Sequence, residues 1–523
     1  MPGPFLLLFV LPALGVAFIG PASAQAPDRR ATNPILWADV PDPSVIRVDS
    51  VYYMTSTTMH MSPGVPIMKS TNLVDWTMVG YAYDALPNVD ALAMRNGQNA
   101  YGRGTWASSI RYHDGMFYVV TFSYTTGETY VFTTTDIASV PWHRVSLGAV
   151  YHDPSLFFDD DGRVYLVYGV GDIRIIELTA DGRSIKAGGE NRVLVRNVGS
   201  IAGTAFNVPG EGSHIHKVNG RYYLFLIVWP RGGMRTELVY RADHLEGPWE
   251  GRVALADEGI AQGGIVDTPE GDWYALLFGD RGAVGRIPYL VPVIWAAGWP
   301  VFGVDGQAPE TLDIPTEGRG VDGIVASDEF EGNQLGLAWQ WNHNPAHTLW
   351  SLESRPGYLR LTTGRIDAGM LSARNTLTQR TFGPTSAAST ALDVSGMKDG
   401  DVAGLALLAE YYGFVGVKKQ NGVTFVVMES ATGDEVERVP FDRPVVHLRA
   451  EADFRNQVDR AAFSYSLDGS DWRPIGDALE MRYTLVHFMG YRFGLFNHAT
   501  TTPGGWADFD YLRLAATAPA PRQ

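Results

Sequence analysis

The stretch PSLFFDDDGRVYLVY, residues 154–168, begins with a small residue and an apolar run, turns at Asp-Gly and continues as an aromatic-rich run. Both runs suit β-strands, and Asp-Gly is a dipeptide that favours tight turns. The stretch therefore predicts a β-hairpin. The same pattern returns in four more segments, which are PSVIRVDSVYYMT (43–55), SSIRYHDGMFYVV (108–120), GSHIHKVNGRYYLFL (212–226) and GGIVDTPEGDWYALL (263–277).

Five repeated hairpins predict a five-bladed β-propeller. The turns at Asp114-Gly115, Asp161-Gly162 and Asn219-Gly220 suit two-residue hairpins, because both central positions need positive φ. The spacing between successive segments leaves room for two more strands, which gives four-stranded blades. A high content of Gly (58), Trp (14) and Tyr (24), with little helical periodicity, favours the same all-β class. We expect the propeller over residues 32–315.

One position is equivalent in all five segments, two residues before the small residue. The innermost strands of a propeller present the same end at one axial mouth, so the side chains at this position are predicted to converge. A single aspartate before a strand commonly forms a local turn, but three acids at one equivalent position indicate a shared site. The five residues are Asp42, Ala107, Asp153, Glu211 and Gln262.

The residues beside these acids carry two further expectations. Pro43 and Pro154 follow Asp42 and Asp153, and a residue before proline is biased towards an extended conformation. Asp39 is out of register with the repeat, so we expect it to bond within a local turn.

Three converging carboxylates point to glycoside hydrolysis. Like charges in one pocket raise each other's proton affinity, so one acid stays protonated while another is ionised. Glycosidases need a general acid that protonates the leaving oxygen and a carboxylate that activates water or attacks carbon. Trp106, beside the second equivalent position, is expected to offer a flat face to a sugar ring.

The segments PDPSVIRV, HDPSLFFDDDGRVYLVYG and EGSHIHKVNGRYYLF resemble, in order, the signature segments of glycoside hydrolase family 43. The resemblance covers residues 32–315 and implies a five-bladed propeller with an inverting mechanism. It implies that Asp42 is the general base, Glu211 the general acid and Asp153 the residue that adjusts the acid's pKa. Arg286, in VGRIP, matches a substrate-contacting arginine, and Gln262 is expected to contact the sugar as well.

The remainder of the chain predicts a second domain. After a Gly- and Pro-containing linker, residues 316–326, alternating runs such as GYLRLTT and AAFSYSLDG over residues 327–515 indicate an antiparallel β-sandwich. This part resembles the concanavalin-like C-terminal domain of arabinofuranosidase- and xylosidase-type members of the family. The resemblance implies that the sandwich narrows the mouth of the propeller and makes the enzyme exo-acting. Residues 516–523 are expected to form a disordered tail.

No cofactor is expected to take part in catalysis, but the sandwich offers a structural metal site. Asp328 and Asp510 lie at the first and last strands predicted for this domain. Carboxylates are ligands that Ca²⁺ selects, so the two acids are predicted to share a calcium ion.

The N-terminus and the composition bear on where the protein works. An apolar run from Phe5 to Gly20, followed by the small-x-small pattern at residues 22–24, predicts a secretory signal peptide over residues 1–24. The mature protein is then secreted or periplasmic and has no membrane segment. The net charge of −16 comes from dispersed acids without a basic patch, which argues against a nucleic-acid partner. The chain has no cysteine, which excludes thiolate chemistry.

The sequence thus predicts an exo-acting inverting glycosidase that removes α-L-arabinofuranosyl or β-D-xylosyl ends from plant cell-wall polysaccharides or oligosaccharides. Three alternatives remain at this stage. They are a non-catalytic sugar-binding propeller, an endo-arabinanase with an open groove, and a retaining fructan-active propeller enzyme.

Overall fold

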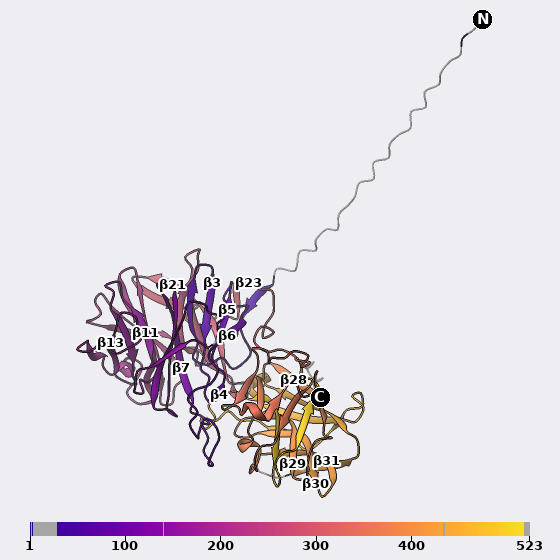
Figure 1. Cartoon of the computed structure of the whole chain (residues 1–523). Coiled ribbons are helices and arrows are strands. Elements are labelled where there is room, and N and C mark those ends of the chain that lie inside the picture. Colours follow the sequence, from indigo (N-terminus) through magenta and orange to yellow (C-terminus); the bar gives the residue numbers. More distant parts are fainter. Residues whose placement is uncertain (2, 4–28, 140, 432–434, 517–523) are drawn as a thin grey trace.

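The computed structural model describes residues 1, 3, 29–139, 141–431 and 435–516. It contains two all-β bodies side by side, the N-terminal one in indigo to salmon and the C-terminal one in orange and yellow (Figure 1). The predicted signal peptide and tail lie outside the described residues, except for residues 1, 3 and 516. Within the described ranges, no helix has the length and apolar character needed to cross a bilayer.

The N-terminal body is the five-bladed propeller that the repeat predicts, with five antiparallel sheets of four strands. The first blade is β2 (Ser44–Val48), β3 (Val51–Thr55), β5 (Gly64–Ser70) and β6 (Thr77–Tyr83). The second is β7 (Thr105–His113), β8 (Met116–Ser123), β9 (Glu128–Thr134) and β10 (His143–Ser146). The third is β11 (Ser155–Phe158), β12 (Val164–Tyr168), β13 (Ile173–Leu178) and β14 (Asn191–Val195). The fourth is β15 (Phe206–Val218), β16 (Arg221–Pro230), β17 (Thr236–Ala242) and β18 (Glu250–Leu255). The fifth is β19 (Ala261–Asp267), β20 (Trp273–Asp280), β21 (Arg286–Ala296) and β22 (Trp299–Phe302).

The first strands of the blades form a closed ring. β2 contacts β7 and β19, β7 contacts β11, and β15 contacts β11 and β19. These strands are therefore the innermost ones around the axis, and the residues just before or early in them face one another across it.

Two of the three predicted tight turns are confirmed. Asp114-Gly115 and Asn219-Gly220 join their strands as two-residue loops, with φ values of 47° and 77° and of 51° and 77°. The prediction for Asp161-Gly162 is wrong, because β11 ends at Phe158 and β12 begins at Val164. In this longer loop Oδ1 of Asp161 accepts a hydrogen bond from the backbone N–H of Arg163 (3.0 Å), which stabilises a wider turn.

The ring closes without a strand shared between the first and last blades. Instead, β1 (Arg30–Thr32) pairs with β23 (Thr311–Pro315) in a separate two-stranded sheet. Asn33 then bonds to the fifth blade: Nδ2 donates to the carbonyl of Leu290 (2.9 Å) and Oδ1 accepts from the N–H of the same residue (2.9 Å). The N-terminal segment is thus fixed to β21 by side-chain hydrogen bonds.

The C-terminal body is a sandwich of two sheets. One sheet contains, in order, β32 (Glu435–Phe441), β31 (Val423–Ser430), β30 (Gly413–Gln420), β29 (Asp401–Leu408), β37 (Arg492–Ala499), β27 (Leu377–Arg380), β24 (Gln340–Asn342) and β4 (Met61–Ser62). The other contains β25 (Trp350–Ser351), β26 (Leu359–Thr362), β38 (Trp506–Phe509), β28 (Thr385–Asp393), β33 (Val445–Asp453), β34 (Arg460–Ser466) and β35 (Arg473–Pro474), with β36 (Leu479–Glu480) and β39 (Arg513–Ala515) at its sides. The 3₁₀ helices are η1 (Val198–Ile201), η2 (Gly282–Val284), η3 (His347–Leu349), η4 (Met370–Ser372) and η5 (Arg455–Gln457).

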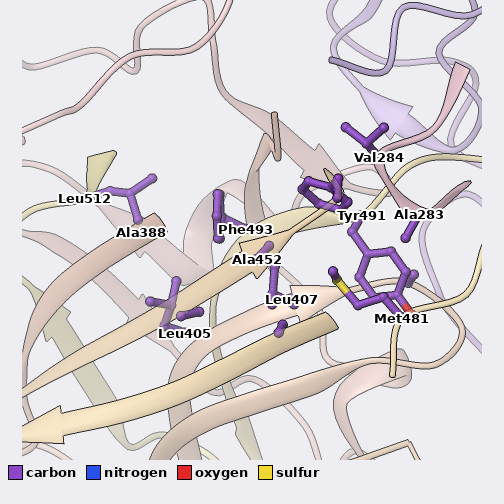
Figure 2. Packing of buried hydrophobic residues seen from close by; sticks show 14 of the residues in the cluster. Ala283, Val284, Ala388, Leu405, Leu407, Ala452, Met481, Tyr491, Phe493 and Leu512 are labelled. Atoms are coloured by element: carbon purple, nitrogen blue, oxygen red, sulfur yellow. The ribbon is translucent and has the colours of Figure 1, made fainter. Parts of the chain in front are cut away.

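The two bodies share both a sheet and a core. Strand β4 comes from the propeller part of the chain and pairs with β24 at the edge of a sandwich sheet. One cluster of buried side chains includes Val284 and Ile287 of the propeller together with Tyr491 and Phe493 of the sandwich. Figure 2 shows Val284 beside Tyr491, whose backbone N–H donates to the carbonyl of Ala283 (2.9 Å). The interface is therefore packed like a domain interior.

Asp39 joins the propeller to the sandwich, so the expectation of a local turn there is wrong. Its Oδ1 accepts from the N–H of Arg286 (2.8 Å), at the start of β21. Its Oδ2 accepts from the N–H of Gly490 (3.0 Å), and its backbone carbonyl accepts from Nε of Arg380 (2.8 Å). Because Asp39 is buried, each of these bonds forms away from bulk water.

Gly490→Ala is predicted to destabilise the protein. A Cβ at this position would lie 2.3 Å from the carbonyl oxygen of Val284 in the propeller. This oxygen belongs to the backbone, so it cannot move aside without shifting the chain around Val284. Overpacking of this kind costs about 1–3 kcal/mol. The thermal unfolding midpoint should therefore fall. In the matched control Gly336→Ala, the new Cβ meets nothing within 4 Å, and equal midpoints for the two variants would contradict the prediction.

Candidate functional site

The five repeat-equivalent residues meet in one cavity of about 490 Å³. Asp42, Ala107, Asp153, Glu211 and Gln262 all line it, each from a different blade. Two larger hollows, of about 790 and 730 Å³, contain none of these residues, so chemistry rather than volume identifies the site. The predicted convergence is thus observed, and the cavity has the size of a small-ligand pocket.

The backbone at this position is left-handed in three of the five blades. φ is 50° at Asp42, 46° at Asp153 and 56° at Gln262. The expectation that the following prolines make Asp42 and Asp153 extended is therefore wrong. Residues other than glycine rarely adopt this conformation, and such strain persists at sites where the surrounding structure enforces it.

Asp42 forms a buried ion pair with Arg286. Nη1 of the arginine lies 2.8 Å from Oδ1 and 3.0 Å from Oδ2, and Oγ1 of Thr57 donates to Oδ2. Burial disfavours the charged guanidinium, but the negative charge of Asp42 reverses this and the pKa of Arg286 lies above its ordinary value. Arg286 lines the cavity, as expected of a substrate-contacting residue, and its main partner is the carboxylate of Asp42.

Asp153 is buried, as Asp42 is. Burial raises the pKa of its carboxyl group above the ordinary value for aspartate. The imidazole of His152 acts in the opposite sense, while the negative charges of Glu211 and Asp42 raise the pKa further. Asp153 is therefore a carboxyl group whose charge depends on the other groups in the cavity.

Glu211 is more open to solvent and is bonded to His152. Nε2 of His152 lies 3.0 Å from Oε2 of Glu211 and 3.6 Å from Oδ1 of Asp153. On the other side of the ring, Nδ1 is 2.9 Å from the hydroxyl of Tyr124. The sequence prediction missed His152 and Tyr124, although His152 stands next to Asp153 in the repeated motif.

Gln262 and Trp106 line the cavity between the acids. The backbone N–H of Gln262 donates to Oε2 of the buried Glu237 (2.8 Å). Gly212 has a φ of 68°, and a Cβ there would lie 2.8 Å from the Gln262 side chain, so only glycine leaves room for this glutamine. Trp106 meets Tyr124 edge to face, with ring centroids 5.2 Å apart.

The sandwich contributes part of the cavity wall, which the sequence prediction did not assign to particular residues. Leu485 and Phe488 line the cavity, and the Phe488 ring lies 4.3 Å from the guanidinium carbon of Arg286. Trp229 and Arg235 of the fourth blade also line it, with the guanidinium carbon 4.6 Å from the indole centroid. None of these four residues stands at the repeat-equivalent position, so the repeat gave no signal for them.

The two acids predicted to hold calcium lie on neighbouring segments. Asp328 forms a β-bridge with Leu512, two residues after Asp510. Its carboxylate accepts from the N–H of Phe330 (2.8 Å) and from Nε1 of Trp339 (2.8 Å). In the described residues, neither acid belongs to a group of three or more ligating His, Asp or Glu side chains. The two hydrogen bonds leave further lone pairs on the Asp328 oxygens, so the calcium site stays a prediction.

Known proteins resemble the chain over nearly its whole length. It is 29% identical to a β-xylosidase of Formosa agariphila, over 92% of this chain and 89% of that protein. It is 27% identical to the non-reducing end α-L-arabinofuranosidase BoGH43B of Bacteroides ovatus, over 94% and 96% of the two chains. The solved structure of a bifunctional GH43-CE protein of Bacteroides eggerthii is 54% identical, with a TM-score of 0.92. That match covers 94% of this chain but 64% of the other one.

Two family models account for both bodies. Residues 327–515 match the β-xylosidase C-terminal concanavalin A-like domain. Residues 31–300 match glycosyl hydrolases family 43, the family that the three signature segments indicate. A carboxylate cavity on a five-bladed propeller, closed on one side by such a sandwich, agrees with both matches. The chain belongs to glycosyl hydrolases family 43.

Proposed function

We propose that this protein is an exo-acting, inverting glycosidase that removes terminal α-L-arabinofuranosyl or β-D-xylosyl residues from plant cell-wall polysaccharides or oligosaccharides. The observation that carries the proposal is the meeting of Asp42, Asp153 and Glu211 in one cavity. Relatives named as a β-xylosidase and an α-L-arabinofuranosidase support the choice of these two sugars.

Asp42 is the proposed general base. A base must be ionised, accessible from the cavity and held still while it takes a proton from water. The bonds from Arg286 and Thr57 hold the carboxylate at the cavity wall. They leave lone pairs on its oxygens for a water molecule.

Glu211 is the proposed general acid and Asp153 the group that adjusts its pKa. Glu211 is the more exposed of these two carboxyl groups, which suits a residue that hands a proton to the leaving oxygen. Asp153 is buried, with its pKa raised by burial, and its negative charge favours the protonated form of Glu211. The two carboxyl groups thus have different environments, which is how acid and base roles are separated in glycosidases.

The cavity wall supports cleavage at chain ends. Leu485 and Phe488 of the sandwich close one side of the cavity, whereas an endo-acting enzyme needs an open groove for a continuing chain. A sugar-binding propeller without catalysis is not favoured, because it has no need of three carboxylates, and carboxylates that share a pocket repel one another.

Export is part of the proposal. The apolar run and the small-x-small pattern before Gln25 support cleavage of a signal peptide and action in the periplasm or outside the cell. N-terminal sequencing of the exported chain should then begin at Gln25.

Hydrolysis of an aryl α-L-arabinofuranoside and an aryl β-D-xyloside at matched concentrations tests the function and identifies the preferred sugar. Wild-type protein should release the aryl group from at least one of them, and the sugar should appear with inverted anomeric configuration in proton NMR. Inactivity on both pentosides, in protein that folds normally, would contradict the proposed function.

The roles of Asp42 and Glu211 are expected to separate by leaving group. Glu211→Ala should lower kcat/KM on a natural oligosaccharide by about 10²–10⁴-fold and spare a dinitrophenyl glycoside, whose leaving group needs no proton. Asp42→Ala should fail on both substrates, because the water lacks a base. If the activated substrate rescued Asp42→Ala and not Glu211→Ala, the two roles would have to be exchanged.

The calcium site is tested by chelation. If Asp328 and Asp510 share a structural Ca²⁺, EDTA should lower the thermal unfolding midpoint and added calcium should restore it. Asp510→Asn should weaken this response without changing the catalytic cavity. An unchanged midpoint after chelation would rule the site out.

A further inference from the structure

His152 is bonded to Glu211 next to the cavity, although it is not one of the residues that line it. Its ring lies between the carboxyl groups of Glu211 and Asp153 on one side and the hydroxyl of Tyr124 on the other. The Phe122 and Trp106 rings pack around it, with centroids 5.1 and 6.0 Å from that of the imidazole. The ring is therefore fixed in orientation by its neighbours on all these sides.

The hydrogen-bond partners assign the proton on Nε2. Oε2 of Glu211 (3.0 Å) and Oδ1 of Asp153 (3.6 Å) accept hydrogen bonds when these oxygens carry no proton, so the nitrogen that faces both carries a hydrogen. At Nδ1 the partner is the Tyr124 hydroxyl, which donates to a neutral ring and accepts from a charged one. The imidazole can consequently gain or lose its second proton without losing a hydrogen bond.

The charges around His152 favour its protonated form. Burial alone lowers the pKa of the imidazole, but Asp153, the hydrogen bond to Glu211 and the more distant Asp42 raise it to about 9. The other charged groups at the cavity are Arg235 and Arg286, and Arg286 is paired with Asp42. Arg235 is ion-paired with Asp280 and acts on Glu211 only through its longer-range charge. Among the described residues, His152 is therefore the cationic side chain in hydrogen-bond contact with Glu211.

We propose that His152 is a positioning residue for the general acid. Its Nε2–H donates to Oε2 of Glu211, so that the transferable proton resides on Oε1. Its positive charge stabilises the carboxylate that Glu211 becomes when it gives up this proton. The inference rests on the proposed function. In the reaction, the proton on Oε1 passes to the glycosidic oxygen while the bond to the anomeric carbon breaks and leaves its electron pair on that oxygen. Water attacks the anomeric carbon and gives its proton to Asp42.

In this role, His152 and Asp153 have opposite effects on the ionisation of Glu211. A cation beside Glu211 favours its ionised form and lowers the pH at which it loses its proton, whereas the negative charge of Asp153 raises that pH. Removal of the cation should therefore move the basic limb of the pH–rate profile upward, and Asp153→Asn should move the same limb downward.

The test compares His152→Ala, His152→Gln and Tyr124→Phe with wild type on a natural oligosaccharide and on a dinitrophenyl glycoside. His152→Ala should lower kcat on the oligosaccharide by about 10- to 100-fold with KM little changed, and the dinitrophenyl substrate should lose much less. His152→Gln keeps an N–H donor without the charge, so it should recover part of kcat while the basic limb still moves up. Tyr124→Phe should move the limb in the same direction by a smaller amount.

Two results would overturn the inference. Equal losses on the two substrates would mean that His152 acts only through packing, and a basic limb that stays in place or moves down in His152→Gln would remove the charge role. Thermal unfolding checks that each variant is folded, and if His152→Ala is not, the glutamine and Tyr124→Phe variants still decide. Failure of the wild type on every pentoside would instead count against the proposed function.

Discussion

The buried ion pair between Arg286 and Asp42 joins the fifth blade to the first, at the point where the ring of blades closes. The backbone of the same two segments is bonded as well, because the N–H of Val40 donates to the carbonyl of Arg286 (2.9 Å). Asp39 accepts from the Arg286 N–H and from the N–H of Gly490 in the sandwich. The same few residues therefore close the ring of blades, dock the sandwich on the propeller and hold the proposed base. A change at one of these contacts is expected to disturb the other two.

The cavity has to hold three carboxyl groups close together, and the electrostatic cost of doing so shapes its surroundings. Asp42 is matched by a buried guanidinium, and Glu211 by an imidazole. Asp153 shares the same imidazole at a longer distance (3.6 Å), and burial beside the other two acids leaves it with a raised pKa. Three acids that are equivalent in the sequence repeat therefore become chemically different through the groups placed next to each of them, which is what an acid–base mechanism requires.

The sandwich is part of the active-site structure and is more than an attached domain. Its loop places Phe488 over the guanidinium of Arg286 and Leu485 at the cavity wall. The same loop continues into Gly490 and Tyr491, which bond to the propeller at Asp39 and Ala283. Because this loop is anchored on both domains, the shape of the cavity depends on the packed interface rather than on the propeller alone.

The sequence by itself determined the propeller, its number of blades and the convergence of Asp42, Asp153 and Glu211. It could do so because a repeat places equivalent residues at equivalent points around an axis, whatever the details of packing. It failed where local preference and tertiary contacts disagree: proline predicts an extended backbone at Asp42, but its φ is 50°, and Asp161-Gly162 lies in a longer loop. Only the tertiary structure decided the groups that surround the acids, since Arg286 and Phe488 reach the cavity, and Tyr124 reaches His152, from other blades or from the other domain. Such contacts join residues far apart in the chain, and no local pattern of the sequence records them.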